Sequence, residues 1–193
     1  HSSCSECPKQ YRGRDAADNS SDYIVVRSIG VQFMEQHSGY ISFYSNDSVI
    51  YTLKTTKETD DVCKVDYVNA TTNDHTQFRR VYGTKTNADY DDLWGTFIHM
   101  DTTKNDPPYN GMVLKRMSGG MNFSIEELLA EFGNHTCGVF AVYPLTVVGT
   151  YYELRVKNSS IKSVGPACMG EFRKRMGTAD NKTLYNETCI TNQ

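Results

Sequence analysis

The chain has 193 residues, a net charge of −3 and an aromatic content of 11%. This length fits one domain that buries roughly 70% of the surface of its unfolded chain, so a small fold held together by cross-links alone is excluded. Because acidic and basic residues are interspersed and nearly balanced, no phosphate-binding surface is indicated, and we expect no nucleic-acid partner.

The cysteines and the glycosylation sequons both indicate secretion. The six cysteines fit a disulfide framework with fifteen possible pairings, at Cys4, Cys7, Cys63, Cys137, Cys168 and Cys189. Eight N-x-S/T sequons occur, at Asn19, Asn46, Asn69, Asn122, Asn134, Asn158, Asn181 and Asn186. These features predict passage through an oxidising secretory pathway. No signal peptide and no run of about 20 apolar residues is found, so we expect a mature, soluble, secreted, extracellular glycoprotein that does not insert into membranes.

Residues 1–47 are expected to form an N-terminal extension. Their C-x-x-C at Cys4 and Cys7 predicts a structural pair, because neither a βαβ context for a redox site nor further zinc ligands are apparent. Two short runs rich in β-forming residues follow, at 23–26 and 40–44.

A series of short strands is predicted next, at 49–53, 62–68, 78–82, 93–100 and 112–117. Their spacing of roughly ten residues is typical of a sandwich or an up-and-down barrel. In the second of these strands the alternation places Lys64 and Asp66 on the same face as Val68.

The segment 123–133 carries conflicting signals. Ser124 followed by Glu127 has the pattern of a capping box, and Gly133 suits a helix C-terminus, so local rules predict a helix. A barrel would require a strand here.

A β-hairpin is predicted over residues 139–156, between two cysteines. In its second strand Glu153 and Arg155 point to one face, while Leu154 and Val156 point to the other. Either the charged face meets solvent, or the apolar face packs outward under a helix and the charges line an interior.

An amphipathic helix is predicted at 164–177, where Cys168, Phe172 and Met176 recur every four residues and Gly177 ends the pattern. Its basic residues 173–175 are interpreted as a solvated face. The tail 178–193 contains Cys189, which suggests that it is pinned to the body.

No spacing of residues supports catalysis, so we expect no enzyme, no catalytic residue, no metal site and no cofactor. The histidines are scattered, and paired acids such as Asp60–Asp61 and Glu126–Glu127 are expected to be solvated. The aromatic residues fit a core, or the wall of a ligand cavity that also attracts cations.

Several motifs occur together in a recognisable order: SVIYTLKTTKETDDVCKVDYVNAT, CGVFAVYP, YYELRV, PACMGEFRKRM and LYNETC. In this the chain resembles the histamine-binding lipocalins of tick saliva, over roughly Ser48 to Cys189. The resemblance implies a mainly β fold. It is an eight-stranded antiparallel barrel (48–160) with a C-terminal helix, in one domain that spans 1–193.

The resemblance also implies the covalent framework. Cys63 would pair with Cys189, and Cys137 with Cys168, which leaves Cys4 and Cys7 for each other. In the same comparison, segment 123–133 corresponds to a barrel strand.

The function that the resemblance implies is sequestration of a small host inflammatory mediator inside the barrel, a biogenic amine such as histamine or serotonin. Glu153 matches an acid that neutralises the amine in this family, whereas Arg155 stands where histamine binders have an aromatic residue. Gly138 stands where a further acid is often found. Trp94 and Phe140 are candidate contacts of the ligand.

Two alternatives remain open. A buried Glu153 is expected to pair with Arg155, which would consume the acid that an amine needs, and an interior arginine suits a carboxylate. The ligand would then be a lipid such as a leukotriene, a fatty acid or a sterol such as cholesterol. Alternatively, the chain modulates immunity by binding a host protein through its loops or its N-terminal extension.

Overall fold

The computed structural model describes residues 39–83 and 87–189. The run at 23–26, Cys4, Cys7 and Asn19 lie outside the described residues. Among the described residues, none of the helices has the length and apolar character needed to cross a membrane. This part of the chain also contains no group of His, Cys, Asp and Glu side chains that could hold a metal ion.

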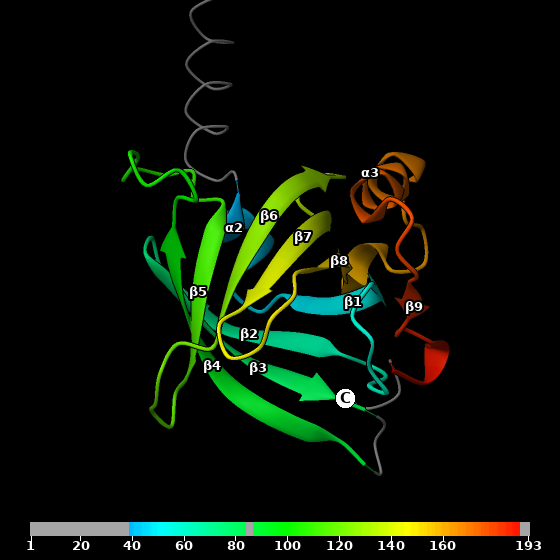
Figure 1. Ribbon diagram of the computed structural model, residues 1–193, viewed down its shortest axis with the longest axis horizontal. Coiled ribbons are helices and arrows are strands. Elements are labelled where there is room, and N and C mark those ends of the chain that lie inside the picture. Colours follow the sequence, from blue (N-terminus) through cyan, green and yellow to red (C-terminus); the bar gives the residue numbers. More distant parts are fainter. Residues whose placement is uncertain (1–38, 84–86, 190–193) are drawn as a thin grey trace, which may run out of the picture. The chain divides into compact units, whose positions relative to one another are not determined.

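Eight antiparallel strands close into a barrel (Figure 1). Each strand pairs with its neighbour in sequence, and β1 closes the barrel by pairing with both β2 and β8. The strands are β1 (Val49–Thr55), β2 (Val65–Thr71), β3 (His75–Tyr82), β4 (Asp89–Ile98), β5 (Gly111–Arg116), β6 (Ser124–Phe132), β7 (Cys137–Pro144) and β8 (Tyr151–Lys157). The short strand β9 (Lys182–Thr183) adds to β1. The expected lipocalin-type barrel is confirmed.

Strand β6 resolves the conflict over segment 123–133 in favour of a strand. It pairs with β5 on one side and β7 on the other, so both rows of backbone hydrogen bonds are satisfied. Ser124, Glu126 and Leu128 alternate into the barrel. These tertiary contacts outweigh the local capping signals, which are worth only about 1 kcal/mol.

Residues 40–44 do not form the expected β-run, and that prediction was wrong. Tyr40–Phe43 form one helical turn, α2, which packs inside one end of the barrel. The side chains of Tyr40, Phe43 and Tyr44 are fully buried there. Since each barrel strand already pairs on both sides, an aromatic segment in the interior cannot add to the sheet and satisfies its own backbone groups as a turn.

Helix α3 (Pro166–Met176) lies on the outside of the barrel against β6, β7 and β8 (Figure 1). Phe172 packs there with Val139, Leu154 and Val156. The apolar face of the 139–156 hairpin therefore packs outward under the helix, and the charged face is interior. Gly177 ends the helix with a φ of 58°, as its position predicted. Two short 3-10 turns, η2 (Asn158–Ser160) and η3 (Glu187–Cys189), complete the fold.

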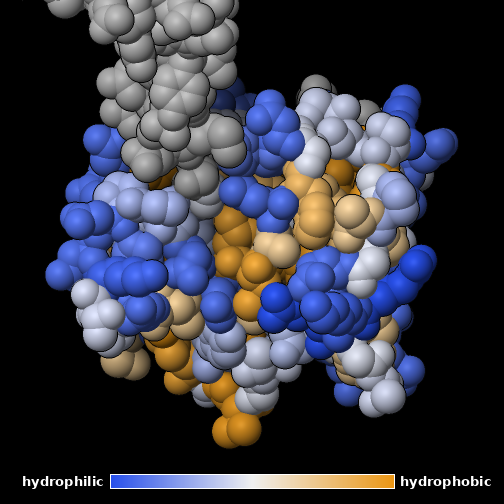
Figure 2. Space-filling model, turned by 90° about the horizontal axis from the view of Figure 1, so that it is seen from above, coloured by the Kyte–Doolittle hydropathy of each residue, from blue (hydrophilic) through white to orange (hydrophobic). Residues whose placement is uncertain are grey.

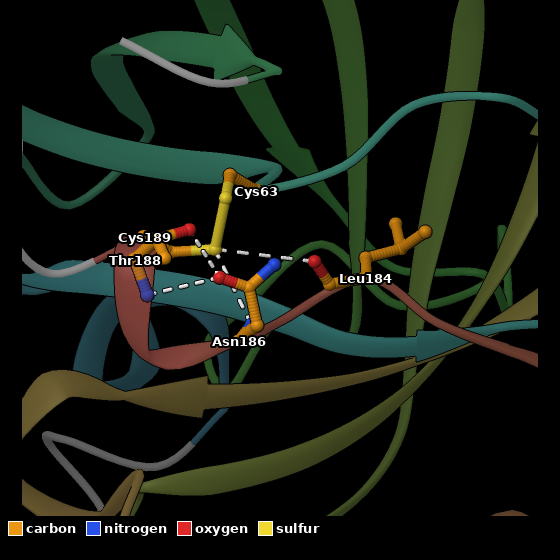
Figure 3. The surroundings of a disulfide bond; sticks show 5 residues. All are labelled: Cys63, Leu184, Asn186, Thr188 and Cys189. Carbon is orange, nitrogen blue, oxygen red and sulfur yellow. Dashed lines mark hydrogen bonds between the residues drawn. A yellow bond between two sulfur atoms is a disulfide. The ribbon is translucent and has the colours of Figure 1, made fainter.

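Both disulfides implied by the resemblance are present. Cys137–Cys168 ties α3 to β7, and Cys63–Cys189 joins residues 126 apart in the sequence. Figure 3 shows the turn that presents Cys189 to its partner. In that turn Thr188 donates its backbone N–H to Asn186 Oδ1 at 2.9 Å, and Asn186 donates its own to Cys189 Sγ at 3.3 Å. The turn η3 is thereby fixed beside the barrel.

Candidate ligand-binding cavity

The barrel interior contains a cluster of buried charged side chains. It consists of three cations and three carboxylates, each at most 6% exposed, and we call it the charge network: Lys64, Arg80, Arg155, Asp66, Glu126 and Glu153. The inward-facing positions of β2, β3, β6 and β8 supply all of them except Lys64, which lies just before β2. The formal charges cancel.

Arg155 joins two of the carboxylates. Its Nε and Nη2 donate to Glu153 Oε2 at 2.9 and 2.6 Å, and its Nη1 donates to Glu126 Oε2 at 2.5 Å and to the Tyr44 hydroxyl at 2.9 Å. The expected pairing of Glu153 with Arg155 is confirmed. All three nitrogens of the guanidinium are thus occupied.

Arg80 binds the other side of Glu126. Its Nε and Nη2 donate to Asp66 Oδ1 and Oδ2 at 2.7 and 2.8 Å. Its Nη1 donates to Glu126 Oε1 at 2.8 Å. The Tyr44 hydroxyl donates to Asp66 Oδ2 at 2.7 Å, which links helix α2 to the network. Bidentate geometry of this kind suits the planar guanidinium.

Lys64 completes the charge network by donating to Glu153 Oε1 at 2.7 Å. Each buried carboxylate therefore bonds at least one cation. Since an uncompensated charge in a dry interior is costly, this mutual compensation explains how six charged groups remain inside the barrel.

The network shifts the pKa values of its members. Burial alone would raise the pKa of Glu153, but the charges of Lys64 and Arg155 outweigh it and lower the pKa to about 2. In the same way Arg155 and Arg80 overcome burial and hold the pKa of Glu126 well below its usual range. Burial lowers the pKa of Lys64 to about 8, with Arg80 acting in the same direction and Glu153 against it.

The lowered pKa values of the two glutamates predict a loss of stability in acid. Their folded-state values lie below the ordinary value of 4.5, so the unfolded chain takes up protons first as the pH falls. We expect the free energy of unfolding to decrease from about pH 4.5 downward and to go on falling towards pH 2. Urea unfolding at a series of pH values measures this. A free energy that stays constant between pH 5 and pH 2.5 would contradict it.

A cavity of about 460 Å³ opens above the charge network, at the barrel end opposite α2. Its floor includes Lys64, Arg80, Glu126 and Glu153. Apolar and aromatic wall residues come from the surrounding strand ends and turns: Phe123, Pro144, Val147, Val148, Tyr151 and Leu184. We call this space the mouth cavity. Threonines and charged residues also line it, so the mouth cavity combines a mixed polar and apolar wall with a charged floor.

A buried hydroxyl also faces the mouth cavity. Ser124 is 5% exposed, it lines the cavity, and its Oγ has no hydrogen-bond partner among the described residues. A buried polar atom without a partner costs free energy. The Ser124 hydroxyl is thus a buried polar group at the cavity whose hydrogen bonding is incomplete.

Only one of the four predicted ligand contacts lines the mouth cavity. Glu153 does so, and Arg155 lies beyond it, fully buried. Phe140 packs against Phe43 of α2 and lies under the Arg155 guanidinium, 4.5 Å from ring centroid to Cζ. Trp94 lies on β4 next to inward-facing Leu93, so it points outward.

Trp94 has its own surroundings on the outer face. Its ring stacks on His75 with centroids 3.9 Å apart, and its Nε1 donates to Thr96 Oγ1 at 3.2 Å. Strand alternation places these side chains on the side of the sheet away from the mouth cavity.

Gly138, where the resemblance would allow an acid, leaves no room for one. A Cβ at this position would lie 2.7 Å from the Phe140 ring and 2.9 Å from the Phe43 ring. Aromatic side chains of α2 and β7 therefore fill this part of the barrel.

Four members of the charge network were not predicted as functional residues: Lys64, Asp66, Arg80 and Glu126. For Lys64 and Asp66 the signal was present, because the alternation placed both on the face of Val68, which is buried in the barrel core. The expectation that Glu126 is solvated was wrong, since this side chain is 1% exposed. Its inward position follows from the strand conformation of β6.

Seven of the eight sequons fall within the described residues, and all seven asparagines are exposed. Their positions are spread over strand ends, turns and the C-terminal tail. Occupancy by glycans is thus sterically open at each of them.

The comparisons with known proteins agree with this architecture. The family model described as tick histamine binding protein matches residues 28–191. No curated protein sequence matches the chain. Among solved structures, the serotonin complex of AM182 superposes with a TM-score of 0.54 at 16% identity, covering 77% of this chain and 91% of that one.

Two further solved structures are similar. Japanin from Rhipicephalus appendiculatus, bound to cholesterol, has a TM-score of 0.52 at 12% identity and covers 75% of this chain and 96% of its own. The siderocalin Ex-FABP has a TM-score of 0.52 at 12% identity, and the match covers 73% of this chain and 94% of that one. At these identities the likeness shows the fold alone.

Proposed function

The chain belongs to the tick histamine-binding protein family, and we propose that it is a secreted salivary glycoprotein that sequesters a small host inflammatory mediator in the mouth cavity. The observation that carries the proposal is the cavity itself, about 460 Å³ with a mixed polar and apolar wall and a charged floor at one end of a closed barrel. Sequestration requires no chemical step. It requires only that the protein exceed the mediator and bind it tightly, with each tenfold gain in affinity needing about 1.4 kcal/mol.

The charge network favours a ligand with an apolar body and a hydrogen-bond acceptor over an amine. Each buried carboxylate already bonds a lysine or an arginine, so a ligand ammonium would have to share a carboxylate whose charge is already compensated. A carboxylate, carbonyl or hydroxyl of a ligand instead meets Lys64 and the Ser124 hydroxyl. Among the candidate mediators, a leukotriene, a fatty acid or a sterol has this character.

A biogenic amine, histamine or serotonin, is the second candidate. It is supported by the family and by two acids at the cavity rim, Glu58 and Asp61, which make no salt bridge within the described part of the chain. An amine bound there would lie at the entrance, above the charge network.

A blocked cavity tests the proposal. We expect the wild type to bind dodecanoate or serotonin, and Ser124→Trp to lose at least roughly tenfold in affinity because the indole occupies the cavity. The matched control is Ser163→Trp, a substitution at an exposed turn position. Isothermal titration of the three proteins measures the effect. Equal affinity of Ser124→Trp and wild type would exclude the mouth cavity as the site.

Binding of a host protein is the alternative from another class. The turn between β7 and β8 supports it, because Leu145, Val147 and Val148 are 50%, 66% and 105% exposed. Figure 2 shows, on the face that it draws, a mainly polar surface with apolar groups in its centre and at its lower edge. Mapping of occupied sequons is the test: a large glycan-free face would favour a protein partner, and glycans over every face would oppose it.

A further inference from the structure

Lys64 differs from the other cations of the charge network. Arg80 and Arg155 each use all three guanidinium nitrogens in bonds to carboxylates. Lys64 Nζ has one acceptor among the described residues, Glu153 Oε1 at 2.7 Å. An ammonium has three N–H donors, so two of them are left for other partners.

These spare donors belong to a side chain at the ligand site. Lys64 and Glu153 both line the mouth cavity, and Lys64 is only 6% exposed. Ser124 Oγ, which also lines the cavity and lacks a partner, adds a second polar atom there. The floor of the cavity therefore offers hydrogen-bond donors to a ligand. Its Glu153 carboxylate is already paired with the Lys64 ammonium.

We propose that Lys64 determines the ligand class of the mouth cavity: its own ammonium covers the Glu153 carboxylate where a ligand amine would bind, and its free N–H groups select a ligand that carries an acceptor. This inference rests on the proposed function, since it concerns the same cavity. A second ammonium beside Lys64 is repelled by the like charge. An acceptor completes the bonding of Lys64 without disturbing the rest of the network.

Removal of the lysine charge should therefore exchange one ligand class for the other. In Lys64→Met, a buried carboxylate oxygen faces the cavity without its cation, and we expect serotonin affinity to rise by roughly tenfold or more. Dodecanoate affinity is expected to fall by a similar factor, because a bond from a charged donor is lost. Lys64→Arg keeps the ion pair and is expected to behave as the wild type.

Two further variants keep the test decisive. Lys64→Gln removes the charge but keeps a donor for Glu153, so it serves if the methionine variant does not fold. In Lys64→Met/Glu153→Gln the amine affinity gained by the single variant should disappear. Circular dichroism establishes which variants are folded, and isothermal titration measures both ligands.

The result that overturns the inference is a folded Lys64→Met or Lys64→Gln protein that binds serotonin no better than the wild type does. Failure of the proposed function looks different: the wild type and Ser124→Trp would then bind dodecanoate and serotonin equally weakly. A gain of serotonin binding in Lys64→Met would still support the role of Lys64.

Discussion

Glu126→Gln should destabilise the protein by about 3–5 kcal/mol, the cost of removing one partner from a buried ion pair. Glu126 accepts hydrogen bonds from Arg80 and from Arg155, and all three side chains are at most 3% exposed. The neutral amide would leave the network with an uncompensated positive charge. Urea unfolding at neutral pH measures the loss.

The adjacent residue provides the matched control for this prediction. Glu127 points to the other face of β6, where it is partly exposed and accepts a hydrogen bond from the Tyr143 hydroxyl at 2.6 Å. Glu127→Gln makes the same chemical change and should cost about 1 kcal/mol or less. Equal losses in the two variants would show that the charge network has no special energetic role.

Loss of the Cys63–Cys189 disulfide should cost about 5 kcal/mol, the value that the chain-entropy model gives for a sequence separation of 126. Native contacts of the tail add to this effect, because Tyr185 packs on Tyr51 with ring centroids 5.2 Å apart. The double variant Cys63→Ser/Cys189→Ser is compared with the wild type by urea unfolding.

Removal of the second disulfide, Cys137–Cys168, provides a comparison for the loss of stability measured by urea unfolding. Cys137–Cys168 closes a separation of only 31 residues, so its removal is expected to cost about 4 kcal/mol. The Cys63–Cys189 variant should also bind ligand more weakly, because Leu184 in the freed tail lines the mouth cavity. A smaller loss of stability for Cys63–Cys189 than for Cys137–Cys168 would contradict the loop-closure argument.

The barrel was predictable because its signals are local and periodic. Alternation in 62–68 and 151–156, with turns at regular spacing, marks the strands, and the resemblance supplied their closure and both disulfide pairings. The segment 123–133 shows the limit of local rules. Ser124 and Glu127 form a capping-box pattern, yet pairing on both edges makes the segment a strand.

Helix α2 could not be predicted from its residues. Its sequence, Tyr-Ile-Ser-Phe, has β-forming residues and no helix signal, and its turn is set by the closed interior that it fills. The aromatic rings of Phe43 and Phe140 meet over Gly138, a contact that joins residues almost a hundred positions apart. Only the assembled barrel defines that space.

The charge network was predictable in part. Glu153 and Arg155 were expected to lie on one face because they are two residues apart in a strand, and the resemblance implied that this face is the interior one. Their partners Lys64 and Glu126 were not identified, because these residues come from segments distant in sequence that only the closed barrel brings close to β8. Trp94 was a candidate ligand contact because it is aromatic, whereas its place in the alternation of β4 directs its side chain outward.

Native mass spectrometry of the protein from its natural source or from insect cells tests the central claim most directly. We predict a bound species that is released on denaturation and that, after extraction, has an apolar body with a carboxylate, carbonyl or hydroxyl group. The Ser124→Trp protein, prepared in the same way, should carry none. Bound histamine or serotonin in the wild type would contradict the preference for a ligand that carries an acceptor, and an extracted lipid that persists in Ser124→Trp would contradict binding in the mouth cavity.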